Sequence, residues 1–155
     1  MPRQAHLKSA TVALLAFCMT LMATACNREK PQSETEKNLQ ALTVCYGRFI
    51  SQNRGKGPPN EAQFKKFIAT LPKDALESFG ADPANADKLF ISPRDNEPYG
   101  IAWNASGGVG GPEGAPMIIW EQKGVGGKRY VADFLGKIEE IDEATFNQRL
   151  ANVKK

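Results

Sequence analysis

Apolar residues in the first half of the folded region recur at spacings of three and four, which is typical of helices with one buried face. In the stretch from 34 to 53 these positions are Leu39, Leu42, Tyr46 and Phe49. Ser33 and Glu36 fit a capping box, in which each side chain accepts a hydrogen bond from the other residue's backbone amide. The sequence therefore predicts a first helix that begins after Ser33 and ends near Asn53, before a segment rich in glycine and proline.

Two shorter helices are predicted to follow. The apolar positions of the first are Phe64, Phe67, Ile68 and Leu71. Asn60 can cap this helix, and Pro72 can stop it because proline has no backbone amide to continue the hydrogen-bond pattern. The second is predicted over residues 74–79, with Gly80 just past its end.

The second half of the chain changes to alternating patterns and short apolar runs, which indicate strands. The segments with this pattern are 89–91, 99–103, 117–121, 129–134 and 137–141. Because the segment 117–121 is apolar on both faces, we expect it in the middle of a sheet. The last two segments flank Leu135 and Gly136 and are predicted to form a hairpin.

A final helix is predicted after Asp142, whose short acidic side chain can cap it. Its inner side is expected to carry Ala144, Phe146, Leu150 and Val153. Helices first and strands later in the chain indicate an α+β fold. We expect the N-terminal helices to pack on a small antiparallel sheet of about three or four strands. The first helix then lies across one face, and the C-terminal helix closes the fold.

The N-terminal segment has the pattern of a secretory signal peptide. Arg3, His6 and Lys8 give it a basic start, and residues 9–27 carry no charge. Its most apolar part is residues 12–17. The uncharged stretch is nearly as long as the roughly 20 apolar residues that a spanning helix needs, but Ser9, Thr11, Thr20 and Thr24 dilute it. Cleavage is therefore the favoured interpretation, and retention as an uncleaved membrane anchor is the alternative.

The mostly small residues Met22-Ala23-Thr24-Ala25 lead directly into Cys26. This boundary resembles the lipobox of bacterial lipoproteins, although Ala23 stands where that family most often has leucine. The resemblance implies that a peptidase cuts before Cys26, that the thiol receives a diacylglycerol and that the new amino group is acylated, for example with palmitate. Two or three acyl chains hold a protein firmly at a membrane. The resemblance thus implies a lipid-anchored protein on the exported side, at the periplasmic or cell-surface face.

These inferences divide the chain into three parts. Residues 1–25 are the predicted signal peptide, and residues 26–33 are the lipidated cysteine with a polar tether. Residues 34–155 are predicted to form a single globular domain, since about 130 mature residues suffice for one hydrophobic core.

Charge and histidine content exclude several functions for the mature chain. The formal net charge is +3, and loss of the two basic residues Arg3 and Lys8 with the signal peptide lowers it to +1. A nearly neutral domain has no electrostatic footprint for nucleic acid. The only histidine, His6, is lost as well, which excludes a serine-histidine hydrolase. We expect no catalytic activity, no cofactor and no metal, with the membrane and an envelope protein as partners.

Cys45 is the one free thiol expected after processing, because Cys18 is removed and Cys26 is acylated. Its apolar neighbours favour a buried cysteine that packs like a small hydrophobic residue. The alternative is a reactive thiol or one that pairs between chains.

Two glycine-rich stretches and one acidic group are candidate ligand sites. Residues 104–116 and 124–129 lack the residues of a phosphate loop and precede strands, so they are predicted to be connections. The acidic residues in irregular sequence are Asp82, Asp87, Asp95 and Glu97. Their spacing matches no EF-hand calcium loop, and they are predicted to be solvated turn residues and caps.

Other groups could support catalysis or binding. The acidic residues near the last strand are Glu139, Glu140, Asp142 and Glu143. They could form a carboxylate pair, but a helix start also favours acidic groups. Ser78, Ser92 and Ser106 have no histidine to activate them. The aromatic residues Tyr99, Trp103 and Trp120 could form a binding surface, but their positions on strands favour core packing.

A second resemblance covers roughly residues 34–150. A long first helix, short helices, the Ser92-Pro-Arg-Asp95 turn and late strands are similar to the globular part of pseudopilins and related prepilin-like proteins. The segment 131–142 resembles their closing hairpin but has Leu135-Gly136-Lys137 where many of them have Asp-Gly-His. The chain also lacks the prepilin leader junction and continuous hydrophobic helix. The resemblance implies a related fold, and in some relatives a calcium-stabilised late loop.

The sequence therefore predicts a lipid-anchored envelope protein that acts as a non-catalytic binding or structural module. One alternative is a pseudopilin-like component of a secretion or filament assembly. A further alternative is an enzyme of unknown class, which would need convergent polar residues with perturbed ionisation in a pocket.

Overall fold

The computed structural model describes residues 32–106 and 114–153. The helices are α2 (Glu34–Gln52), α3 (Glu61–Ile68), α4 (Lys73–Ser78), the 3-10 helix η1 (Pro83–Phe90) and α5 (Glu143–Val153). The strands are β1 (Tyr99–Ile101), β2 (Met117–Glu121), β3 (Lys128–Asp133) and β4 (Ile138–Asp142). The fold is of the α+β class, as the sequence predicts, with N-terminal helices, an antiparallel sheet and a C-terminal helix. Among the described residues, no helix is both long and apolar enough to span a bilayer.

The four strands form an antiparallel meander in the order β1-β2-β3-β4. β2 is therefore central, as its two apolar faces predict. β3 and β4 form the predicted hairpin around Leu135 and Gly136, and Gly136 has a φ of 85°, which glycine adopts without a steric penalty. Tyr99 lies opposite Glu121 in the register of β1 and β2, so their side chains share one face of the sheet.

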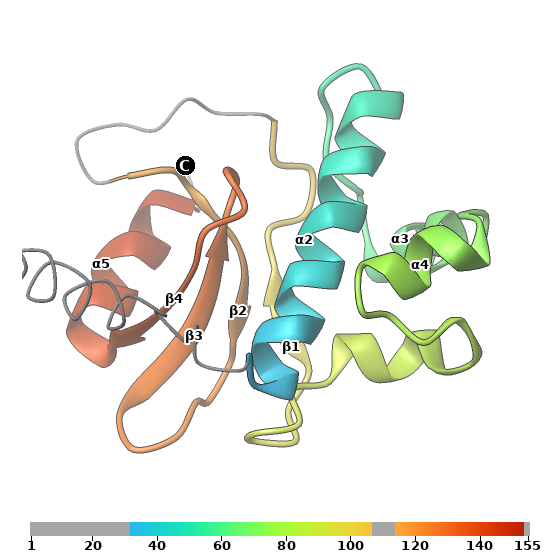
Figure 1. Ribbon diagram of the computed structural model, residues 1–155. Coiled ribbons are helices and arrows are strands. Elements are labelled where there is room, and N and C mark those ends of the chain that lie inside the picture. Colours follow the sequence, from blue (N-terminus) through green and yellow to red (C-terminus); the bar gives the residue numbers. More distant parts are fainter. Residues whose placement is uncertain (1–31, 107–113, 154–155) are drawn as a thin grey trace, which may run out of the picture. The chain divides into compact units, whose positions relative to one another are not determined.

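Helices lie on both faces of the sheet, as Figure 1 shows. α2 crosses one face against β2 and β3, and α5 packs on the other. The larger cluster of buried apolar side chains is on the α2 side and also includes residues of α3, α4 and η1. A smaller cluster of Met117, Val131 and Phe146 lies under α5.

α2 has the boundaries that its capping box predicts. The Ser33 hydroxyl accepts a hydrogen bond from the Glu36 amide at 3.2 Å, and the Ser33 amide donates to the Glu36 carboxylate at 2.7 Å. Asn53 caps the other end. The first helix therefore begins at a fixed residue close to the predicted tether.

Phe64 lies at the centre of the larger cluster and is fully buried. Its ring makes edge-to-face contacts, at centroid distances of 5.8 to 6.4 Å, with the rings of Tyr46, Phe49, Phe90 and Trp103. The Tyr46 hydroxyl donates to the Ala102 carbonyl at 2.5 Å, so the polar end of this buried ring is satisfied. The aromatic contacts join α2, α3, η1 and the turn after β1.

Two predicted elements differ in the structure. α3 ends at Ile68 instead of Leu71, because the amides of Thr70 and Leu71 bond three residues back in a tight turn before Pro72. Of the run predicted at residues 89–91, Leu89 and Phe90 instead end the 3-10 helix, and Ile91 forms an isolated antiparallel bridge with Pro98. Short apolar runs do not distinguish a strand from a buried helical turn.

One strand boundary and one predicted buried position were also wrong. β1 ends at Ile101, and the chain turns at Trp103 and Asn104, where Asn104 has a φ of 59°. Ala144 is exposed, so the inner side of α5 consists of Phe146, Leu150 and Val153.

Candidate functional site

Cys26, the predicted lipidation site, lies outside the described residues, as do residues 1–25. The described part that follows it in sequence begins at Gln32, directly before the N-cap of α2. Among the described residues, those around the start of α2 are therefore the nearest in sequence to a lipid anchor at Cys26.

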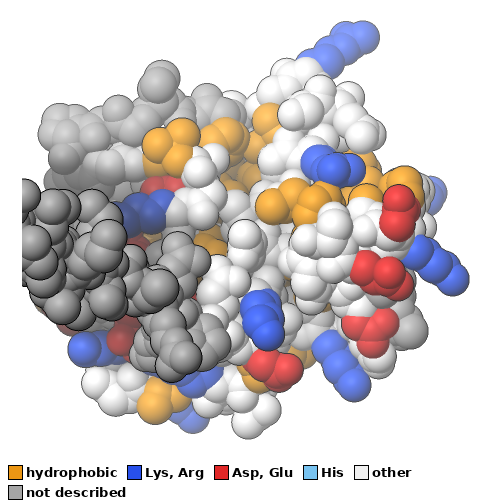
Figure 2. All heavy atoms as spheres, viewed as in Figure 1, with side chains coloured by type: hydrophobic (Ala, Val, Ile, Leu, Met, Phe, Trp, Pro, Cys, Tyr) orange, Lys and Arg blue, Asp and Glu red, His pale blue; other side chains and the backbone are white. Residues whose placement is uncertain are grey.

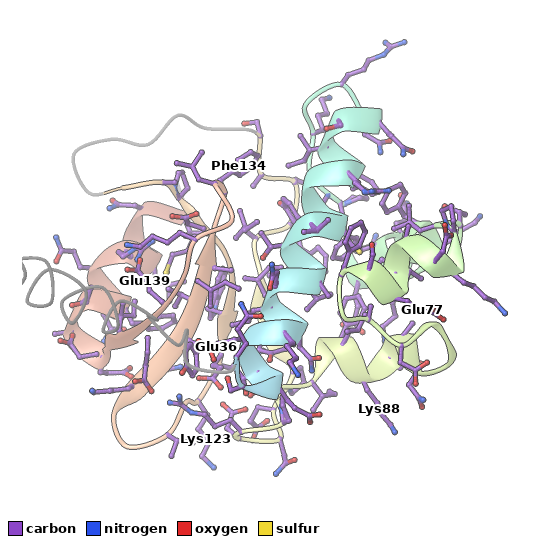
Figure 3. The ribbon with its side chains drawn as sticks, viewed as in Figure 1. Glu36, Glu77, Lys88, Lys123, Phe134 and Glu139 are labelled. Carbon is purple, nitrogen blue, oxygen red and sulfur yellow. The ribbon has the colours of Figure 1, made fainter. Side chains whose placement is uncertain are left out.

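An open cleft of about 380 Å³ lies beside the first turns of α2. α2 contributes Glu34, Lys37 and Asn38 to its lining. The other lining residues come from the segment that leads through η1 to the Ser92-Pro93 turn, and they are Gly80, Asp82, Asn85, Lys88, Leu89, Ile91 and Pro93. Figure 3 shows the Lys88 side chain extending outward from η1.

The charged groups of the cleft are largely uncommitted. Glu34, Lys37 and Lys88 make no side-chain hydrogen bond or ion pair within the described chain, although each lines the cleft. Asp82 accepts a hydrogen bond from the Asn85 amide at 2.5 Å. By contrast, Lys65 on the neighbouring α3 bridges Glu61 and Asp87, each at 2.8 Å. Basic and acidic side chains are interspersed on the face seen in Figure 2.

A second polar cluster surrounds Glu121, which is fully buried at the end of β2. One carboxylate oxygen accepts from the Ser92 hydroxyl at 2.9 Å, and the other accepts from the Tyr130 amide at 2.8 Å. The Arg94 guanidinium lies 3.7 Å from the same carboxylate. The buried charge is thus paired and hydrogen-bonded, which burial of a carboxylate requires.

Arg94 connects the Ser92-Pro-Arg-Asp95 turn to the sheet. It pairs with Glu140 on β4 at 2.6 Å and donates to the Lys128 carbonyl at 2.9 Å. Its guanidinium also stacks over the Tyr130 ring at 4.8 Å. Its Nε is buried and has no acceptor among the described residues. These contacts make the cluster around Glu121 and Arg94 a structural clamp between the turn and three strands.

The four carboxylates near the last strand do not converge on one point. Glu140 pairs with Arg94, and Glu143 pairs with Arg129 at 2.9 Å. Asp142 caps α5 by accepting from the Thr145 amide at 2.8 Å, and this hydrogen bond lowers the pKa of the Asp142 carboxyl.

Glu139, labelled in Figure 3, is held between two cations. It accepts from Lys137 at 2.6 Å and from Arg149 of α5 at 2.5 Å. The hydrogen bond from Lys137, together with that from Arg149, lowers the pKa of the Glu139 carboxyl. An acid catalyst needs a raised pKa, so Glu139 is arranged as a charged structural partner of α5.

The other predicted positions fall into structural surroundings. Asp95 accepts from the amides of Glu97 and Gly124, so it fixes two turns. Tyr99 is buried, Trp103 packs on Phe64, and Trp120 packs on Phe146 on the opposite face. The three aromatic residues therefore form no common surface. Among the residues that the structure describes, no group of three histidine, cysteine, aspartate or glutamate residues is placed to hold a metal ion.

The remaining candidates are the serines and the glycine-rich stretches. Ser78 donates to the Ala75 carbonyl, Ser92 belongs to the Glu121 cluster, and Ser106 is exposed. Of the stretch 104–116, residues 107–113 lie outside the described chain. Of the stretch 124–129, residues 124–127 lie in the connection between β2 and β3, as predicted, and Lys128 and Arg129 begin β3.

Cys45 is fully buried in α2, as its apolar neighbours predict. Burial raises the pKa of the Cys45 thiol to about 11, although the nearby Arg48 opposes this. Since the thiolate is the reactive form, the folded protein should keep this thiol inert.

We expect iodoacetamide at pH 8.5 to leave Cys45 unmodified in the folded protein and to modify it fully in denaturing urea. Mass spectrometry of the labelled protein measures both states, and a Cys45→Ala variant assigns the signal. Because the raised pKa favours the protonated folded form, this group's contribution to stability should be lost as pH rises from about 9 towards 11. Rapid modification under native conditions would contradict the buried assignment.

The sequence predictions did not identify Glu121, Arg94 or the cleft. A glutamate that ends the apolar run Met-Ile-Ile-Trp-Glu was an available signal, because a charged residue on a buried strand needs a partner. Glu34 and Lys37 lie three residues apart on the predicted first helix, which places them on one face. Lys88, which lines the same cleft, is far away in sequence, and no local pattern joins it to them.

Comparison with known proteins identifies no relative. No protein-family model matches the chain, and no curated protein and no solved structure has a significant match to it.

Proposed function

We propose that this chain is a lipid-anchored envelope protein that acts as a non-catalytic binding or structural module. The observation that carries the proposal is the run of small residues into Cys26, followed by a short polar stretch and a helix capped at Ser33. A lipid at Cys26 would hold the domain at the exported face of a membrane, and no nucleic acid is among its proposed partners.

The polar clusters of the domain support a binding or structural role. The acidic side chains of β4 and α5 are taken up by ion pairs with arginines and lysines or by a helix cap. The buried Glu121 holds a turn against the sheet. Charged side chains without an ion-pair partner in the described chain line an open cleft. Such a cleft can bind a ligand without any catalytic group.

A Cys26→Ser variant tests the anchor. We expect the wild-type protein to sediment with membranes and to require detergent for release, because multiple acyl chains bind a bilayer firmly. The variant should lose this membrane association and appear in the soluble fraction or accumulate unprocessed. Immunoblots of fractions after high-salt and detergent washes measure the difference, and Cys45→Ala is the matched control. Equal detergent-dependent membrane association of a processed Cys26→Ser protein would contradict the proposal.

The alternative proposal is an assembly subunit similar to the pseudopilins. The observation that favours it is a long helix laid across an antiparallel meander, in the order that the sequence resemblance implies. A fold by itself does not supply a function. A calcium-dependent rise in melting temperature, or filaments formed with partner subunits, would favour this alternative over the lipid-anchored module.

A further inference from the structure

We propose that the cleft beside α2 binds a small zwitterion that carries a phosphate and a primary ammonium, the chemistry of a phosphoethanolamine headgroup. Lys37 and Lys88 would hold the phosphate, and Glu34 would accept hydrogen bonds from the ammonium. The source of the headgroup, a membrane lipid, rests on the proposed lipid anchor at Cys26. The chemistry of the cleft does not.

The charge balance of the cleft selects this ligand class. Two ammonium groups, Lys37 and Lys88, face the same open volume as two carboxylates, Glu34 and Asp82. A simple anion would be attracted by the lysines and repelled by the carboxylates. A simple cation would be attracted by the carboxylates and repelled by the lysines. A ligand with both charges can pair with both sets, and charge-assisted hydrogen bonds are the stronger kind.

The groups are also free to bind. Glu34 and Lys37 are three residues apart on α2 and lie on one face of the helix, while Lys88 lines the cleft from η1. None of the three has an ion-pair partner within the described chain. Asp82 is already bonded by Asn85, so the proposal assigns the ammonium to Glu34.

The size and lining of the cleft suit a headgroup with the beginning of its apolar part. A volume of about 380 Å³ falls at the lower end of the range for small-molecule sites. Beside the charged residues, Leu89, Ile91 and Pro93 give an apolar side, and Ile91 is 39% exposed. An exposed large hydrophobic side chain next to charged groups that are unpaired within the described chain fits a molecule whose polar end continues into hydrocarbon.

The position of the cleft in the chain brings it within reach of a membrane. Seven peptide steps separate Cys26 from Ser33. At full extension they span at most about 25 Å, and the cleft begins at Glu34. A domain tethered at Cys26 therefore cannot carry the start of α2 far from the headgroups of its own membrane.

The first arm of the test uses the full mature chain in a non-ionic detergent and titrates glycerophosphoethanolamine by NMR. We expect shift changes confined to residues that line the cleft. Lys37→Ala and Lys88→Ala should each weaken binding about fivefold, since each removes a charge-assisted contact. Lys123→Ala, an exposed lysine outside the cleft that Figure 3 labels, should leave it unchanged. Glycerophosphocholine should bind more weakly to the wild type, because its ammonium donates no hydrogen bond, and Glu34→Gln should reduce that preference.

The proposal is supported if binding is saturable, if Lys37→Ala and Lys88→Ala both weaken it, and if Lys123→Ala leaves it unchanged. Absence of saturable binding, or equal loss in Lys123→Ala, would overturn it. The second arm places the same proteins on phosphatidylethanolamine or phosphatidylcholine vesicles and compares the same resonances. Changes with the first lipid alone identify a lipid headgroup, whereas binding of the soluble compound alone identifies a free zwitterion as the ligand.

The two proposals can fail separately. If the mature chain carries no lipid but the soluble arm shows binding, the anchor is wrong and the cleft assignment remains. If the chain is lipidated at Cys26 and neither arm shows binding, the anchor remains and the cleft assignment is wrong.

Discussion

Replacing Glu121 with alanine is expected to lower the free energy of unfolding by about 3–5 kcal/mol, the usual cost of removing one partner of a buried ion pair. The carboxylate is fully buried and accepts from Ser92 and from the Tyr130 amide. Its loss would leave these donors unsatisfied. Arg94 would also lose one of its two carboxylate partners among the described residues and would keep only Glu140. The Ser92-Pro-Arg-Asp95 turn should then detach from the sheet before the remainder unfolds.

Urea denaturation followed by circular dichroism measures this effect. Glu140→Ala is the matched control, because Glu140 pairs with the same arginine but is 34% exposed. Exposed pairs contribute about 0–1 kcal/mol, so this variant should change stability much less. Glu121→Gln should fall between the two, since it keeps an acceptor and loses the charge. Equal stability of Glu121→Ala and the wild type would show that the clamp does not hold the turn.

The Phe64→Ala substitution is expected to destabilise the fold by a similar amount, about 3–5 kcal/mol. Phe64 is fully buried and contacts four aromatic rings, so its removal leaves a cavity where α2, α3, η1 and the turn after β1 meet. Because these four rings come from three separate elements, the cavity cannot close by moving one of them. The cost should therefore lie near the upper end of the range.

Thermal and urea unfolding of Phe64→Ala can be compared with Phe67→Ala on the same helix. Phe67 is only partly buried and packs chiefly on Phe49, with ring centroids 5.1 Å apart. We expect Phe67→Ala to lose less than half as much stability. If the two variants lose equal amounts, Phe64 is not the centre of the core.

Local signals in the sequence predicted the parts of the fold that depend on neighbouring residues. The capping box at Ser33 and the apolar spacing from Leu39 to Phe49 predicted α2, and the apolar run at Met117 predicted the central strand β2. These features are fixed by side chains within one turn or one strand, so a single segment contains the information.

Features that depend on distant contacts were missed or misplaced. Leu89 and Phe90 point into the core from a 3-10 helix, and a short apolar run does not distinguish that from a strand. The pairing of Ser92 and Arg94 with Glu121 joins residues almost thirty positions apart. The cleft combines the first turn of α2 with η1, and their juxtaposition follows from tertiary packing. The lipidation site at Cys26 was predicted from sequence and remains a proposal.

The proposed lipid anchor implies that the mature protein begins at a lipidated Cys26. The most direct measurement is the intact mass of the protein extracted with detergent from its native membrane, beside the Cys26→Ser variant. We expect a chain that begins at Cys26 and carries the added mass of a diacylglycerol and an amide-linked acyl group, with both groups absent from the variant. An unmodified chain that retains residues 1–25 would contradict the proposed lipid anchor and would identify the segment as an uncleaved anchor.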